Sequence, residues 1–132
     1  MYRVISICDD EMTRLIKLKN SDTGIIEECF DDSRVLSDEN FSFMELEHEY
    51  DCKIKLFGNV AHDDKSKAIL CTVVCKEVQI GTRKLVKVVF EDNYYYIPKG
   101  KVGNVEEGDT FYFQFSRKDL IQVDNVIHAD LL

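Results

Sequence analysis

Long apolar runs are missing from this sequence of 132 residues. The longest, Ala68 to Cys75, is interrupted by Thr72 and is far shorter than the roughly 20 residues that a transmembrane helix needs. The first residues, MYRVISICDDE, also lack a basic stretch followed by an apolar core and a small-residue cleavage site, so no secretory signal is expected. These absences predict a soluble protein that resides in the cytoplasm.

Catalytic motifs are absent as well. The sequence has no Gly-x-Ser-x-Gly, no His-Glu-x-x-His and no glycine-rich loop of the kind that cradles phosphate. His48 and His62 stand beside carboxylates, which suit a divalent cation if the fold brings two such groups together. Because neighbouring residues on a strand point to opposite faces, we expect both of them, and His128, to be solvated loop residues. A metal-dependent enzyme is therefore the least favoured hypothesis, and no cofactor is expected.

The cysteines do not form the pattern of a disulfide framework. There are five, an odd number, at irregular spacing. Cys71 and Cys75 lie four positions apart in a run of β-branched residues, and on a strand that separation is roughly 13 Å, too far for a shared zinc ion or a disulfide. We expect the five thiols to be small buried apolar groups in a reducing compartment.

Negative charge is unevenly distributed within the net charge of −8. Residues 1–62 contain 14 Asp or Glu and 7 Lys or Arg, a balance of −7, whereas residues 63–132 contain 11 and 10, a balance of −1. An acidic protein repels phosphate at long range. Nucleic-acid binding is therefore disfavoured unless the basic residues of the second half share one face.

The most frequent pattern in the sequence is an alternation of apolar and polar residues. It is strict from Tyr50 to Leu56 and from Thr110 to Ser116, and it indicates half-buried strands. Turn residues such as Asn20 to Gly24 separate the runs. The pattern predicts one all-β domain over residues 1–132, with seven to eight mostly antiparallel strands in a small barrel or barrel-like sandwich. At most one short helix is expected, over residues 41–49, where three apolar side chains follow helical spacing.

A weak internal match links the two halves of the chain. Leu15 to Leu18 matches Leu85 to Val88 at an offset of 70, and Tyr50 to Leu56 matches Asp109 to Phe115 at an offset of 59. Two amphipathic hairpins can resemble each other by pattern alone. The alternative is an internal repeat, residues 1–58 and 68–132, in which two four-strand units form one barrel or two packed sheets.

The most plausible binding surface lies in the nearly neutral half. Aromatic and basic residues of this kind stack bases and hold phosphates on small barrels. The candidate residues for a ligand or partner surface are Tyr94, Tyr95, Tyr96, Arg83, Lys84, Lys99 and Lys101. Three consecutive tyrosines on a strand must present at least one ring to each face.

Three functions remain open on this basis. The first is a non-enzymatic interaction domain that binds a protein partner or itself. The second is an oligonucleotide-binding β-barrel, and the third is the metal-dependent enzyme.

Overall fold

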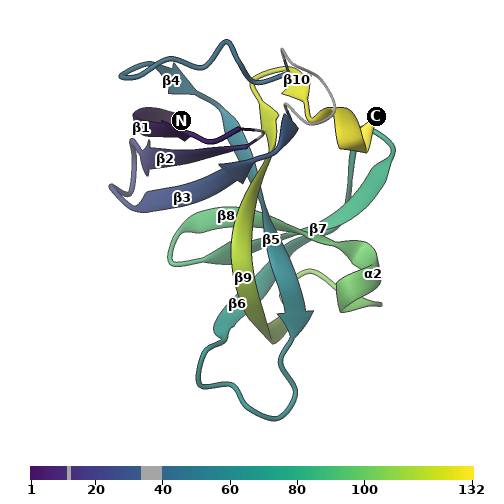
Figure 1. Ribbon diagram of the computed structural model, residues 1–132. Coiled ribbons are helices and arrows are strands. Elements are labelled where there is room, and N and C mark those ends of the chain that lie inside the picture. Colours follow the sequence, from purple (N-terminus) through teal and green to yellow (C-terminus); the bar gives the residue numbers. More distant parts are fainter. Residues whose placement is uncertain (12, 34–39) are drawn as a thin grey trace.

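The computed structural model describes residues 1–11, 13–33 and 40–132, and these ranges form the predicted all-β, barrel-like architecture (Figure 1). Eight strands have six or more residues: β1 (Tyr2–Asp9), β2 (Arg14–Asn20), β3 (Ile26–Asp31), β5 (Cys52–Val60), β6 (Ile69–Ile80), β7 (Arg83–Phe90), β8 (Asn93–Pro98) and β9 (Thr110–Val123). Two-residue strands β4 (Glu49–Tyr50) and β10 (Val126–Ile127), the one-turn helix α2 (Lys99–Val102) and the 3-10 turn η1 (Ala129–Leu131) complete the elements.

The strands of the described residues belong to one sheet, in the order β4-β1-β2-β3-β9-β5-β8-β7-β6, and β10 pairs with β9 off this path. β6 also pairs with β9, so that β9, β5, β8, β7 and β6 close into a ring. On the other side β1 pairs with β4, which only Asp51 separates from β5. The long strands β5 and β9 pair with each other and run through the centre of the molecule, between β1–β3 and β6–β8 (Figure 1).

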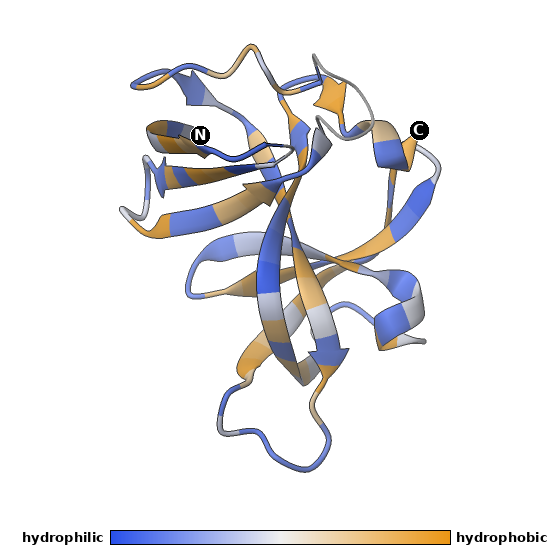
Figure 2. Cartoon of the chain, in the orientation of Figure 1, coloured by the Kyte–Doolittle hydropathy of each residue, from blue (hydrophilic) through white to orange (hydrophobic). Residues whose placement is uncertain are grey.

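Alternating apolar side chains fill one core between these two groups of strands. Figure 2 shows the alternation of hydrophilic and hydrophobic residues along β1 and β2. Val4, Ile16, Leu18 and Ile54 have no exposed surface, because each lies on the inward side of its strand. β5 and β9 approach closely where their register shifts, and a Cβ atom at Gly58 would lie 2.0 Å from the carbonyl oxygen of Gln114. A glycine is therefore required at this crossing.

The helix predicted over residues 41–49 is wrong. The segment consists of turns, and two of the three side chains that follow helical spacing, Phe43 and Leu46, are exposed, whereas the third, Tyr50, is buried. Its backbone bonds to β1 instead: the N–H of Glu47 donates to the carbonyl of Val4 at 2.8 Å, and the N–H of Val4 donates to the carbonyl of His48 at 3.0 Å. These sheet-like bonds, with a positive φ of 68° at Glu47, leave no helical hydrogen-bond pattern.

The two halves of the chain share a pairing scheme. β1-β2-β3 and β6-β7-β8 are both antiparallel meanders, and the first pairing of each has a register shift just after equivalent pairs, Val4 with Leu18 and Val73 with Val88. Leu18 and Val88 lie 70 positions apart, which is the offset of the sequence match. This correspondence supports the internal repeat, which stays a prediction.

The last long strand of each half, β5 or β9, pairs with the three-stranded meander of the other half. β3 pairs in parallel with β9 of the second half, and β8 pairs in parallel with β5 of the first. The remaining pairings are antiparallel, as expected.

Within the ranges given above, no helix is long and apolar enough to cross a membrane.

Candidate functional site

The tyrosine run presents its rings to both faces of β8, as its position on a strand predicts. Tyr95 points into the core with 3% of its surface exposed, and its hydroxyl donates to Oε1 of Glu27 at 2.9 Å. Burial, followed by the charge of Glu27, raises the pKa of Tyr95 well above its ordinary value. Tyr94 and Tyr96 point outward, but Tyr96 is 6% exposed whereas Tyr94 is 50% exposed. Tyr94 is therefore the ring of this run that a ligand can reach most easily.

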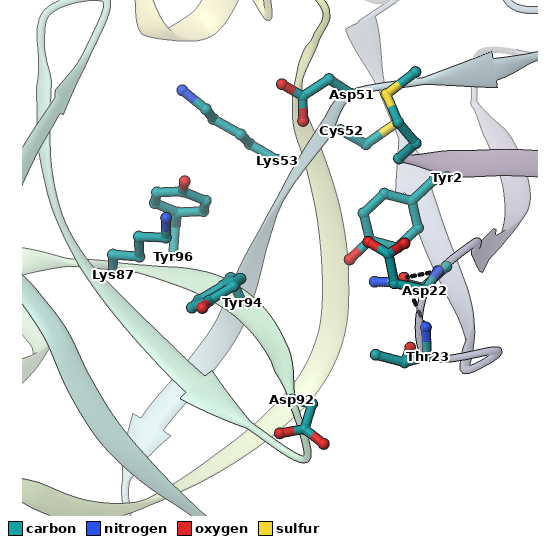
Figure 3. A pocket seen from close by; sticks show the side chains of 12 residues that line it. Tyr2, Asp22, Thr23, Asp51, Cys52, Lys53, Lys87, Asp92, Tyr94 and Tyr96 are labelled. Atoms are coloured by element: carbon teal, nitrogen blue, oxygen red, sulfur yellow. Dashed lines mark hydrogen bonds between the residues drawn. The ribbon is translucent and has the colours of Figure 1, made fainter.

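Tyr94 and Tyr96 line one side of a cleft of about 340 Å³, and Tyr2 lines the opposite side (Figure 3). The ammonium group of Lys87 lies 4.4 Å from the centre of the Tyr94 ring, and that of Lys53 lies 5.9 Å from the centre of the Tyr96 ring. Three carboxylates line the same cleft: Asp22, Asp51 and Asp92. Because they offset the charge of the two lysines, this cleft offers no concentrated positive field to a phosphate.

The predicted basic residues lie elsewhere. Arg83, Lys84 and Lys99 line a separate groove of about 310 Å³ beside the C-terminal turn. Lys99 is paired there with Glu77, at 3.1 Å. Lys101 borders a third groove and donates to the side-chain oxygen of Asn59 at 3.0 Å. The fold thus separates these four cations from the tyrosine cleft.

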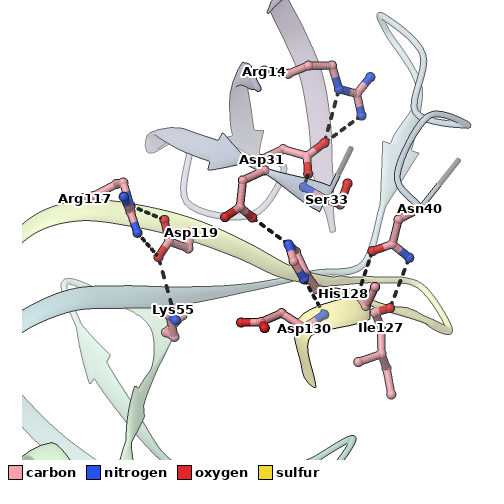
Figure 4. A network of polar contacts seen from close by, with 12 residues as sticks. Arg14, Asp31, Ser33, Asn40, Lys55, Arg117, Asp119, Ile127, His128 and Asp130 are labelled. Carbon is pink, nitrogen blue, oxygen red and sulfur yellow. Dashed lines mark hydrogen bonds and ion pairs between the residues drawn. The ribbon is translucent and has the colours of Figure 1, made fainter. Parts of the chain in front are cut away.

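His128 is buried, so the prediction that it is a solvated loop residue is wrong. It is 4% exposed, and its Nε2 lies 2.6 Å from a carboxylate oxygen of Asp32 (Figure 4). Its Nδ1 accepts a hydrogen bond from the backbone N–H of Asp130 at 3.0 Å. It therefore caps the C-terminal turn. His48 and His62 are exposed as expected, and in the described parts of the chain no three His, Cys, Asp or Glu side chains gather closely enough to hold a metal ion.

All five cysteines are unpaired. Cys29, Cys52 and Cys71 are buried as predicted, but Cys8 is exposed and Cys75 is half-buried. The prediction fails at Cys8 because it lies at the outer end of β1, beside the β1–β2 turn, where the sheet has little to pack against it.

A different surface, on the outer side of β2, β3, β9 and β5, carries exposed apolar side chains. We call it the phenylalanine face, and its residues are Leu15, Ile26, Phe30, Phe57, Phe115 and Arg117. Leu15, Ile26 and Phe57 are 38%, 53% and 48% exposed. All but Phe57 line one groove of about 350 Å³, which Glu28, Ser116 and Lys118 also line.

Arg117 lies at the centre of the phenylalanine face. Its guanidinium carbon is 4.8 Å from the centre of the Phe30 ring and 4.5 Å from that of the Phe57 ring. Its Nε and Nη2 donate to the two carboxylate oxygens of Asp119, at 2.6 and 3.2 Å, and Lys55 also pairs with that carboxylate (Figure 4). These bonds hold the guanidinium plane between two aromatic rings and preorganise the face.

Strand alternation contained a signal for this face. Phe57 continues the outward series of Lys53 and Lys55 on β5, so the alternation predicts that its ring is exposed. A single exposed ring is common, and only a contiguous apolar patch marks a contact surface. The grouping itself was not predictable, because Phe30 and Phe57 come together only through β9.

No protein-family model, no curated protein and no solved structure matches this chain.

Proposed function

We propose that this protein is a non-enzymatic interaction domain that binds a protein partner through the phenylalanine face. The observation that carries the proposal is Arg117 held between the exposed Phe57 and the half-buried Phe30. Aromatic residues and arginine are enriched in the residues that contribute most to protein binding. Rings fixed in a sheet also lose little conformational entropy when a partner binds them.

The oligonucleotide-binding hypothesis has less support. Its aromatic residues, Tyr94 and Tyr96, share a cleft with three carboxylates, and its cations line other grooves. A strand laid across the tyrosines would therefore meet few positive charges. For location we propose the cytoplasm, a choice that the five unpaired thiols support.

Two substitutions on the exposed part of the face test the proposal, Phe57→Ser and Leu15→Ser. Leu46→Ser is the matched control, because Leu46 is 53% exposed and lies in the turn segment before β4, outside the phenylalanine face. The tagged full-length chain and its variants are used for affinity purification from cells that express the native protein, with quantitative mass spectrometry as the readout.

We expect a partner that is recovered with the wild type and with Leu46→Ser but reduced about tenfold or more with both face variants, which corresponds to about 1.4 kcal/mol of lost binding. Circular dichroism of each variant checks that it is folded. Equal recovery with all four proteins would rule the face out as the binding surface.

A further inference from the structure

The face equivalent to the phenylalanine face in the second half of the chain is covered. Leu15 of β2 pairs with Phe30 of β3, and Leu85 of β7 pairs with Pro98 of β8 at the corresponding position of the second meander. Both leucines lie on the outward side, away from the main core. Leu15 is nevertheless 38% exposed, whereas Leu85 is 2% exposed. The difference lies in what packs on the sheet from outside.

The C-terminal segment, residues 126–132, is what covers the second face. Leu131 packs there in a small separate core, whose other buried members are Ile80, Leu85, Tyr96 and Ile121, and Ile127 packs against its edge. The backbone N–H and the hydroxyl of Thr82 both donate to the carbonyl of Leu131, at 2.6 and 3.0 Å. In this segment β10 is hydrophobic and the following turn mixes hydrophilic and hydrophobic residues (Figure 2). The segment shows what kind of chain fits a face of this architecture.

The tail of a second copy is not free to cover the phenylalanine face. Asn40 holds its own tail with two hydrogen bonds, from its Nδ2 to the carbonyl of Ile127 at 3.2 Å and from the N–H of Ala129 to its Oδ1 at 2.9 Å (Figure 4). Releasing the tail would break these bonds and expose Leu85 and Tyr96. We therefore assign the occupant to a different protein rather than to the tail of a second copy.

We infer that the phenylalanine face binds a short aliphatic segment of a partner protein, comparable with residues 126–132 of this chain: a brief extended stretch followed by one helical turn, with two aliphatic side chains four positions apart. The inference rests on the proposed function and adds the chemistry of the partner. Proteins recognise apolar side chains of partner peptides in hydrophobic grooves, as when an amphipathic helix lays its apolar face into one.

Arg117 supplies the polar contact that such a segment needs. A guanidinium group has five N–H donors, and the bonds to Asp119 use two of them. The side chain is 41% exposed. Its remaining donors can bind a peptide carbonyl on the phenylalanine face, as Thr82 binds the carbonyl of Leu131 on the covered face.

The test uses the full-length protein and a fluorescein-labelled peptide of residues 124–132, DNVIHADLL, as the probe. Fluorescence anisotropy should show saturable binding that weakens about tenfold or more in Phe57→Ser and in Leu15→Ser and changes less than about twofold in Leu46→Ser. A peptide with serine at the positions of Ile127 and Leu131 should not bind. Binding that is equal in all the protein variants would overturn the inference.

A second measurement locates the peptide. A photoreactive leucine replaces the residue at the Leu131 position of the probe, and mass spectrometry maps the adducts after irradiation. Adducts on Leu15, Phe30 or Phe57 support the inference, whereas adducts on Leu85 or Tyr96 mean that the probe exchanges with the chain's own tail and overturn it. If no peptide binds but a partner is still lost in Phe57→Ser, the chemistry assigned to the partner is wrong and the proposed function stands.

Discussion

At the scale of single residues, Glu27 is a carboxyl group buried in the core. Its side chain is 1% exposed, and its Oε1 accepts hydrogen bonds from the Tyr95 hydroxyl at 2.9 Å and from the Lys118 ammonium at 3.2 Å. Its Oε2 has no hydrogen-bond partner within residues 1–11, 13–33 and 40–132. A buried charge is tolerated only when it is paired, so these two bonds tie β3 to β8 and β9 of the other half.

Buried thiols and phenols make the protein sensitive to alkaline pH. Burial raises the pKa of Cys52, Cys71 and Tyr2 to about 12 each, from ordinary values of 9.0 for the thiols and 10.0 for the phenol. In the unfolded chain these groups ionise near their ordinary values, while in the folded protein they stay neutral. The stability that is fully present below pH 9 should therefore be lost progressively as the pH rises toward 12.

We expect urea unfolding in the presence of a reductant to give a clearly smaller free energy of unfolding at pH 10.5 than at pH 8. Cys71→Val removes one of the groups and should make that loss smaller. A free energy that is the same at both pH values would contradict the burial of these groups.

At the scale of elements, the C-terminal segment stabilises the sheet by covering β7 and β8. Leu131 is 6% exposed, whereas its neighbour Leu132 is 73% exposed. Leu131→Ala should lower the free energy of unfolding by about 2–5 kcal/mol, because it removes a buried leucine from the small outer core. Leu132→Ala should change it by less than about 0.5 kcal/mol. Urea unfolding of the pair checks this, and similar values for both would mean that the tail does not pack as described.

Sequence patterns predicted the elements better than their partners. Alternation located the strands because each side of a strand meets a different environment. The segment 41–49 was misread because apolar spacing cannot show that Glu47 and His48 bond to β1.

The binding surface was less predictable for a related reason. Tyr94 to Tyr96 stand out in the sequence. However, Tyr95 points into the core and donates a hydrogen bond to Glu27, and Tyr96 is nearly buried. Leu15 and Leu85 occupy matching places in a similar local sequence, and only the fold shows that one is covered by a segment from the far end of the chain. The exposure of an outward-facing side chain depends on segments that are distant in the sequence, and a local sequence pattern does not show where those segments pack.

At the scale of the whole molecule, neither half is complete without the other. β3 pairs with β9 and β8 pairs with β5, so each group of three strands is bonded to the fourth strand of the opposite half. β5 and β9 also pair with each other along nearly their full length. The main core accordingly draws on both halves, from Tyr2 to Val123.

This exchange predicts one cooperative unfolding transition. Far-ultraviolet circular dichroism, which reports the strands, and tyrosine fluorescence, which reports the packing around the six tyrosines of both halves, should give coincident urea transitions with a single midpoint. Two separated transitions would show that the halves unfold independently and would contradict the exchanged pairing.

The exchanged strands also bear on how such a chain could arise, and we propose that it contains two copies of one four-strand unit. A single unit would have to associate with a second one to complete its sheet, so it would fold only at sufficient concentration, and its two outer faces would be identical. Joining the units in one chain removes the concentration dependence and lets each face change separately. The covered Leu85 and the open Leu15 are what such separate change produces: one face closed by the end of the chain, and the other left available to a different molecule.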